Sequence, residues 1–203
     1  RKKRKKINKI ESHRDSLWLF DRRTKMHYGQ IMIADSANGA GIRLTLFVSG
    51  CTNHCPGCFQ PETWDFSFGE PYTQEVEDKI LDELQKPYYD GLTILGGEPF
   101  EIENQPALLP LIKRVHEMNP KRTIWMYTGF HYEDLLPDGK RYTPFTDSIL
   151  DKIDILVDGP FQEENKNISL NFRGSTNQRI IDIPQTRKAG RIVLSPLQES
   201  SLL

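Results

Sequence analysis

Short apolar runs alternate with amphipathic stretches along most of the chain, and this pattern predicts strands that alternate with helices. Strands joined by helices in this way pair in parallel, so an α/β fold is expected. The runs expected to form strands are 30–35, 42–49, 92–95, 123–127 and 153–157, and the periods expected to form helices are 74–86, 104–119, 131–136 and 145–152.

Local signals mark two of these boundaries. Thr73 is a good N-cap for the helix at 74–86, acidic side chains follow in its first turn, and Pro87 ends it. The segment Asn38-Gly39-Ala40-Gly41 is expected to form a turn between the first two strands, because glycine reaches positive φ without strain.

Charge is distributed unevenly over the 203 residues. Residues 1–25 hold eleven lysines or arginines against three acidic side chains, whereas the rest of the chain holds sixteen against twenty-five. A block of like charges repels itself, so residues 1–25 are expected to form a solvated, disordered extension; a targeting or nucleic-acid-binding arm is the alternative. The acidic remainder argues against a nucleic-acid partner.

Composition limits the class of protein further. The length suggests one domain, and no apolar run approaches the ~20 residues that span a membrane. The three cysteines are an odd number, and nothing else marks the chain as secreted. We therefore expect a cytoplasmic protein without a membrane partner.

All three cysteines lie in one stretch of eight residues, Cys51-Thr-Asn-His-Cys55-Pro-Gly-Cys58, which follows the strand at 42–49 and precedes Phe59. Thiolates this close in sequence can converge on one inorganic centre. A four-iron cluster usually takes four cysteines, so three would leave one iron open to a substrate.

Other interpretations of these cysteines remain. A closed zinc site would need a fourth ligand, and His54 is the only local candidate, placed inside the loop between two cysteines. Buried structural cysteines are disfavoured because unrelated cysteines seldom cluster, and a disulfide is disfavoured because the odd count leaves one thiol free.

A second chemical motif, Gly96-Gly97-Glu98-Pro99, ends the strand at 92–95. Glycines let a ligand approach the backbone, and a carboxylate beside them can accept a hydrogen bond from an ammonium group. On its own the motif fits an ordinary glycine turn equally well. Like the cysteines, however, it follows a strand, and parallel sheets place their active sites at the carboxyl ends of strands.

The cysteine spacing followed by an aromatic residue resembles the signature of the radical S-adenosylmethionine superfamily. The resemblance implies an open, incomplete (β/α)6-type partial TIM barrel of parallel strands. It also implies that Cys51, Cys55 and Cys58 hold a catalytic [4Fe–4S] cluster whose open iron binds the amino and carboxylate groups of S-adenosyl-L-methionine. The implied cofactor-binding residues are Gly57, Cys58, Phe59, Gly96, Gly97 and Glu98, with Asp158 and Arg173 as further candidates for cofactor or partner binding.

Further segments narrow the resemblance. Cys51 to Trp64, Trp125 to Phe130, Val157 to Phe161 and Phe172 to Gln178 are similar to segments of the activating proteins of anaerobic (class III) ribonucleoside-triphosphate reductases. This resemblance extends over roughly residues 26–183. It implies three parts, which are the extension 1–25, a radical S-adenosylmethionine activating domain at 26–186 and a C-terminal tail at 187–203.

The resemblance also implies an activity and its partners. Electron transfer from the cluster would cleave S-adenosylmethionine, and the resulting radical would take a hydrogen atom from a glycine of the large reductase subunit. Reduced flavodoxin or a similar protein would be the electron donor.

Two departures from the family pattern keep alternatives open. Ala40 replaces a usual proline, and Glu98 replaces a frequent aspartate, as is common in pyruvate formate-lyase activating enzymes. An activator of another glycyl radical enzyme, a 7-carboxy-7-deazaguanine synthase-like enzyme and a small electron-transfer iron–sulfur protein are therefore the alternatives.

Overall fold

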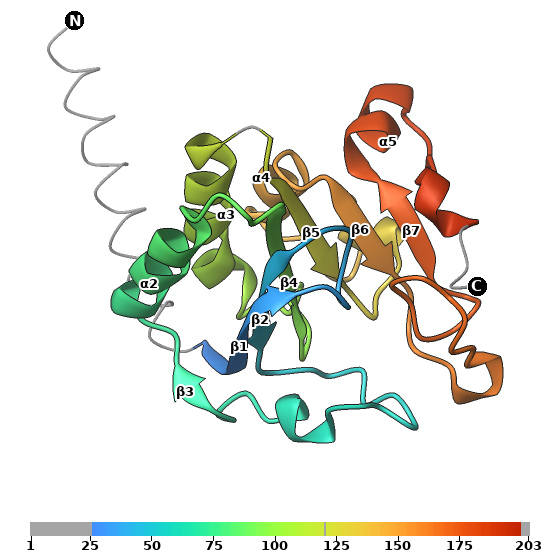
Figure 1. Ribbon diagram of the computed structural model, residues 1–203. Helices are drawn as coiled ribbons and strands as arrows, with labels where there is room; N and C mark the ends of the chain where they lie inside the picture. Colours follow the sequence, from blue (N-terminus) through green and yellow to red (C-terminus); the bar gives the residue numbers. More distant parts are fainter. Residues whose placement is uncertain (1–25, 120, 200–203) are drawn as a thin grey trace, which may run out of the picture.

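A sheet of seven strands in the order β3-β1-β2-β4-β5-β6-β7 organises the protein, and the computed structural model describes residues 26–119 and 121–199. Figure 1 shows α2 and α3 lying together on one side of this sheet. The sheet does not close on itself, because β3 and β7 are its two ends. In chain order the elements are β1 (His27–Asp35), β2 (Arg43–Val48), η1 (Pro61–Trp64), β3 (Glu70–Pro71), α2 (Gln74–Leu84), β4 (Gly91–Gly96), α3 (Gln105–Met118), β5 (Thr123–Tyr127), η2 (Tyr132–Leu135), α4 (Thr146–Leu150), β6 (Ile155–Asp158), η3 (Glu163–Asn165), β7 (Arg179–Asp182), α5 (Ile183–Ala189) and η4 (Pro196–Gln198).

Strand direction agrees with the sequence in the middle of the sheet and differs at its edges. The neighbours β2, β4, β5 and β6 are parallel, as expected. β1, β3 and β7 run antiparallel to their neighbours, so the expectation of parallel pairing throughout is wrong there. For β1 and β2 the reason is their connection, because the short turn 36–42 cannot carry the crossover that a parallel pair requires.

The two faces of β2 serve different purposes. Leu44, Leu46 and Val48 point to the helix side and belong to the main core, which α2 and α3 complete. Because side chains alternate along a strand, Arg43, Thr45 and Phe47 point to the opposite side. All six residues of β2 are buried, including the polar Arg43 and Thr45 on the face opposite the helices.

The predicted helices form close to their expected bounds. The Thr73 hydroxyl accepts a hydrogen bond from the backbone N–H of Val76 at 3.4 Å and so caps α2, as the sequence indicates. Ile80 and Leu84 bury the apolar face of this helix. The expected short helix at 131–136 is present as the 3-10 helix η2.

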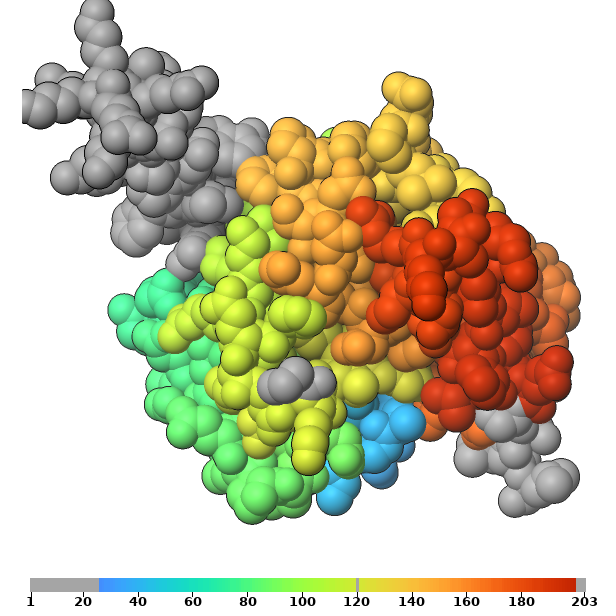
Figure 2. All heavy atoms as spheres, turned by 90° about the horizontal axis from the view of Figure 1, so that it is seen from above, coloured from blue at the N-terminus to red at the C-terminus, as the bar shows by residue number. Residues whose placement is uncertain are grey.

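The segment after β7 continues the fold as far as residue 199. It includes most of the stretch 187–203, which was expected to be a C-terminal tail. α5 ends at Gly190, whose φ of 64° places it in the left-handed region. The chain then returns along β7, where the N–H of Ser195 donates to the carbonyl of Ile180 at 2.8 Å. Figure 2 shows this red segment lying directly against the orange segment that precedes it.

Residues 1–25, expected to be a disordered extension, lie outside the described residues. Within the described part, no helix has the length and apolar character that a membrane crossing would require.

Candidate functional site

A cavity of about 790 Å³ lies where the parallel strands end. Its lining includes Cys51 after β2, Gly97 after β4, Thr128 after β5 and Gly159 after β6. The remaining walls include the β1–β2 turn, the loop that follows β2 and the β6–β7 loop (residues 159–178). The strand ends therefore bring together the two motifs that the sequence singles out, as parallel sheets do.

The first cysteine is held by backbone hydrogen bonds to η1. The N–H of Gly50 donates to the carbonyl of Thr63 at 2.8 Å, and the N–H of Cys51 donates to the carbonyl of Trp64 at 3.2 Å. These bonds continue the line of β2 into the cysteine loop (residues 51–58). The position of the first thiol is thus set by main chain rather than by flexible side chains.

The other two cysteines flank a tight turn. The N–H of Cys58 donates to the carbonyl of Cys55 at 3.1 Å, and Gly57 adopts a φ of 73° that favours glycine. All three thiols are free, with Cys51 buried and the other two half-buried. All three line the cavity, so the structure brings together the residues expected to hold an inorganic centre.

The environment of these thiols matters for metal binding. Burial raises the pKa of the Cys51 thiol to about 11, and the nearby Glu98 carboxylate adds to the effect. Burial also raises the pKa of the Cys55 thiol. Both thiols therefore carry protons at neutral pH until a metal displaces them.

The spacing of the three cysteine sulfur atoms indicates whether they already surround a single metal ion. Among the described residues, only His131, Glu133 and Asp158 bring three ligand atoms within 4.8 Å of one another. The three cysteine sulfurs therefore do not all lie within that distance. A single tetrahedral zinc ion, with Zn–S bonds of about 2.3 Å, would hold them about 3.8 Å apart. In this conformation the three sulfurs are not gathered around a single tetrahedral ion.

His54, the alternative fourth ligand, is engaged elsewhere. Its ring lies against Trp64, with 4.6 Å between the centroids, and His54 is not among the cavity-lining residues. Its φ of 46° is unusual for a residue other than glycine. The closed zinc site considered from sequence therefore lacks its fourth ligand in this conformation.

The two glycines of the second motif are required by the close approach of β2. A Cβ at Gly96 would lie 2.7 Å from the backbone of Val48, and one at Gly97 would lie 2.6 Å from the carbonyl oxygen of Gly50. The N–H of Glu98 also donates to that carbonyl, at 2.8 Å. Gly96 and Gly97 line the cavity, although the N–H of Gly97 already donates to the carbonyl of Val48 at 2.7 Å.

Glu98 is fully buried and does not line the cavity. Its carboxylate accepts hydrogen bonds from the N–H groups of Phe100 and Gly129, from the Thr128 hydroxyl and from the Asn53 amide, at 2.7–3.3 Å. Burial raises the pKa of Glu98 to about 7, against these hydrogen bonds, which lower it. The side chain joins the cysteine loop to the turn after β5.

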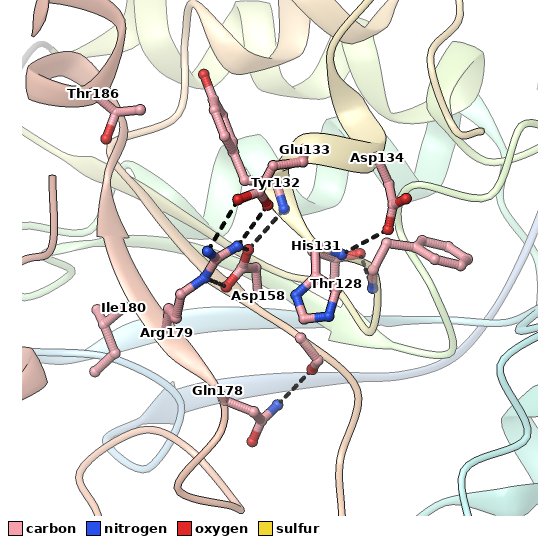
Figure 3. Close-up of polar contacts among 12 residues, drawn as sticks. Thr128, His131, Tyr132, Glu133, Asp134, Asp158, Gln178, Arg179, Ile180 and Thr186 are labelled. Carbon is pink, nitrogen blue, oxygen red and sulfur yellow. Dashed lines mark hydrogen bonds and ion pairs between the residues drawn. The ribbon is translucent and has the colours of Figure 1, made fainter. Parts of the chain in front are cut away.

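Asp158, a candidate for cofactor or partner binding, forms part of an ionic cluster beside the cavity (Figure 3). Its carboxylate accepts hydrogen bonds from the guanidinium of Arg179 and from the N–H of Tyr132. Arg179 also forms a salt bridge with Glu133 at 2.8 Å. The hydrogen bonds to Asp158 and then Glu133 raise the pKa of Arg179. The ligand atoms of His131, Glu133 and Asp158 do not form an open metal site, because the guanidinium of Arg179 already pairs with both carboxylates.

Arg173 lines the cavity, in contrast to Asp158. Its guanidinium donates to the backbone carbonyls of Gln178 and Gln198, and its buried Nε has no partner among the described residues. Burial lowers the pKa of Arg173. An arginine that bonds only neutral carbonyls at the edge of a cavity is suited to receive an anionic group.

A clamp on the cysteine loop was not expected from sequence. Glu101 is buried, and its carboxylate accepts hydrogen bonds from the N–H and hydroxyl of Thr52, at 2.8 and 2.6 Å. Arg141 pairs with the same carboxylate at 2.9 Å and donates to the Thr52 hydroxyl at 2.7 Å. The three residues are far apart in sequence, so no local pattern indicates the clamp.

The fold and the cysteine-lined cavity are those of an α/β protein with an iron–sulfur centre, and comparison with known families agrees. The family model described as a 4Fe-4S single cluster domain matches residues 37–181.

Individual relatives are similar over most of the chain. Proteins named anaerobic ribonucleoside-triphosphate reductase-activating protein from Salmonella typhimurium and Vibrio cholerae are 39% and 41% identical over 155 and 157 residues, which cover 75% and 76% of this chain and 96% and 97% of the relatives. The protein of the same name from Enterobacteria phage T4 is 34% identical over 155 residues, 76% of this chain and 93% of the relative. The chain belongs to the family of anaerobic ribonucleoside-triphosphate reductase-activating proteins.

Proposed function

We propose that this protein is a radical S-adenosylmethionine enzyme that generates the glycyl radical of an anaerobic ribonucleoside-triphosphate reductase. The observation that carries the proposal is the set of three free thiols that line one cavity at the ends of the parallel strands. The activity named for the relatives supports the same conclusion. The reductase is the partner, and reduced flavodoxin or a similar protein is the electron donor.

Cys51, Cys55 and Cys58 would hold a [4Fe–4S] cluster, leaving one iron for the cofactor. The cluster, when bound, supplies an electron that cleaves S-adenosylmethionine to methionine and the 5′-deoxyadenosyl radical, which takes a hydrogen atom from a glycine of the reductase. The chain's own residues position the reactants and exclude water. No acid or base is assigned to this step.

The cofactor would lie along the strand ends. The backbone of Gly96 and Gly97 at the cavity wall would bind the methionyl group, and Gly57, Cys58 and Phe59 would lie next to the cluster; of these three, Cys58 and Phe59 line the cavity. Glu98 would act from behind this backbone, because its carboxylate already accepts four hydrogen bonds from the protein. Its negative charge would still favour an ammonium group nearby.

Arg173 and Asp158 would contribute in different ways. The cavity-facing Arg173 would bind an anionic group, such as the carboxylate of the cofactor. Asp158 would position the neighbouring Gly159, which does line the cavity, through its bonds to Arg179 and Tyr132.

The fold would be that of an open, incomplete (β/α)6-type barrel. The four parallel strands and the unclosed sheet support this assignment. The activating domain would comprise residues 26–186, with 1–25 as an extension that the activity does not need. Removing residues 1–25 should leave iron content and S-adenosylmethionine cleavage within about twofold of the full chain. A truncated protein without a cluster would contradict this division.

The test of the function uses the full chain, reconstituted with iron and sulfide without oxygen. With dithionite and S-adenosylmethionine it should release 5′-deoxyadenosine, and with the reductase it should produce the doublet electron paramagnetic resonance signal of a glycyl radical. An electron-transfer protein would leave the cofactor intact. An activator of another enzyme would cleave the cofactor without forming a radical on this reductase.

A further inference from the structure

Two exposed apolar side chains mark one part of the cavity mouth. Of the large hydrophobic residues that the structure describes, Ile168 and Phe59 are the most exposed, at 86% and 69%. Both belong to the lining of the same cavity, although one comes from the β6–β7 loop and the other follows the cysteine loop. Single exposed apolar residues are ordinary, but two that converge on a functional opening point to a binding surface.

The loop that carries Ile168 is built rather than irregular. Its two arms are joined by a β-bridge between Lys166 and Ser175. The N–H of Thr176 donates to the carbonyl of Asn165 at 2.9 Å, and the N–H of Asn167 donates to that of Gly174 at 3.2 Å. These bonds hold Ile168 out at the rim, where none of the described residues covers it.

The charge at this rim selects the chemistry of a partner. The ammonium of Lys166 lies 5.2 Å from the centroid of the Phe59 ring and forms no salt bridge with a described residue. On the cavity side Lys166 meets no acidic residue, because the cavity lining contains no aspartate or glutamate, whereas Glu164 lines a neighbouring pocket together with Lys166 and Ile168. A complementary segment would therefore present an apolar side chain together with a carboxylate.

We propose that Phe59, Lys166 and Ile168, here called the apolar rim, form the docking surface for the glycine-bearing segment of the reductase. The inference rests on the proposed function, which requires that segment to reach the cavity. The segment would place an apolar side chain between Ile168 and Phe59 and a carboxylate next to Lys166. Its glycine would then face the interior of the cavity.

The test separates docking from cofactor cleavage. Ile168→Asp removes the apolar contact and places a negative charge where the partner is expected to carry one. Ile33→Asp is the matched control, because Ile33 is also highly exposed, at 62%, but lies on β1 and does not line the cavity. Both variants are reconstituted with iron and sulfide and assayed with S-adenosylmethionine and dithionite, with and without the reductase.

We expect Ile168→Asp to raise the reductase concentration for half-maximal radical formation by at least about tenfold. Release of 5′-deoxyadenosine without reductase should stay within about twofold of wild type, and Ile33→Asp should match wild type in both assays. Lys166→Gln should weaken the salt dependence of radical formation, because one charge pair is removed.

Two results would overturn the docking proposal while leaving the function intact. The first is equal radical formation by Ile168→Asp and wild type at limiting reductase. The second is a loss of partner-independent cleavage in Ile168→Asp, which would place this residue in the cofactor site. If wild type cleaves the cofactor but forms no radical on the reductase, the proposed function fails and the docking surface fails with it.

Discussion

The two walls of the cavity are built on different physical principles. The wall formed by β2 and β4 is held by main-chain hydrogen bonds and by backbone contacts so close that only glycine fits, at Gly96 and Gly97. The wall formed by β6 and β7 has its own main-chain ladder and in addition depends on side chains, through the salt bridges of Arg179 to Asp158 and Glu133. Sequence motifs mark both walls, but only the first wall contains thiols, and all three of them line the cavity.

This difference shows that residues of a sequence motif can hold a loop in shape as well as take part in the chemistry of the site. Gln178, at the end of the Phe172 to Gln178 segment, accepts a hydrogen bond from the N–H of Gly174 at 2.8 Å and donates to the carbonyl of Gly159 at 3.1 Å. It thereby fixes the shape of the β6–β7 loop. Substitutions in the wall formed by β2 and β4 should therefore cause loss of the cluster, whereas substitutions in the wall formed by β6 and β7 should lower the free energy of unfolding.

The cysteines give the largest expected effect. Replacing any one of Cys51, Cys55 and Cys58 with Ala should abolish S-adenosylmethionine cleavage, because a second iron would lose its protein ligand and the cluster would degrade. Iron analysis and the visible absorbance of reconstituted protein measure the loss. His54→Ala is the control and should keep most of its iron and activity. Bound zinc in wild type, without iron-dependent absorbance, would contradict the assignment.

Gly97→Ala tests the close backbone contact of the first wall. The new Cβ would meet the carbonyl oxygens of Gly50 and Thr63 at 2.6 and 2.9 Å, so the backbone next to Cys51 must move. Displacements of about 1 Å at a reaction centre cost about a hundredfold in rate, and we expect a loss of that size in cofactor cleavage. Gly190→Ala is the control: it strains a left-handed backbone position, at a φ of 64°, but nothing lies within 4 Å of its new Cβ and Gly190 does not line the cavity. Equal losses in both variants would argue against a specific effect.

Glu101→Gln tests the clamp on Thr52 and should have a smaller effect. Residues that hold metal ligands in place typically contribute tenfold to a hundredfold, so iron affinity and cleavage should fall by about tenfold. Glu77→Gln is the matched control, because Glu77, on α2, is equally buried and pairs with Arg114 of α3 at 2.7 Å. Both variants should lose roughly 2 kcal/mol of unfolding free energy. A similar loss of iron in both would remove the clamp from the mechanism.

Much of the helix and strand pattern could be predicted from the sequence, because it depends on local periodicity. The strand at 123–127 and the helix start at Gln74 are examples. The strands β3 and β7 were not predicted, because β3 has only two residues and β7 has four, whereas β1 was expected as a strand at 30–35 but not as an antiparallel one. Elements this short contain too few positions for a period to be recognised.

The hydrogen-bond partners of buried polar residues were the other feature that could not be predicted from the sequence. Arg43 is fully buried within a strand, where its guanidinium donates to the carbonyls of Leu92 and Thr123 and to the hydroxyl of Thr93 at 2.6–2.8 Å. Its partners come from β4 and β5, so only the assembled sheet reveals them. The clamp of Glu101 on Thr52 escapes sequence analysis for the same reason. The thiols were predictable because all three ligands lie in one short stretch.

Asp158→Asn should give the smallest effect on catalysis and tests the second wall. Asparagine keeps the volume of the side chain but removes the charge that faces Arg179, whose remaining partner Glu133 is exposed. Breaking a buried ion pair costs several kcal/mol, and because Arg179 is partly exposed and keeps one partner we expect a loss of about 2 kcal/mol in unfolding free energy.

Cofactor cleavage per folded molecule should stay within about threefold of wild type in Asp158→Asn, because Asp158 does not line the cavity. Chemical denaturation measures the first quantity, and the KM for S-adenosylmethionine measures the second. Arg179→Gln should destabilise the protein similarly, and the double variant should lose less than the sum, since both residues belong to one ion pair. A KM raised by tenfold or more with unchanged stability would instead place Asp158 in contact with the cofactor.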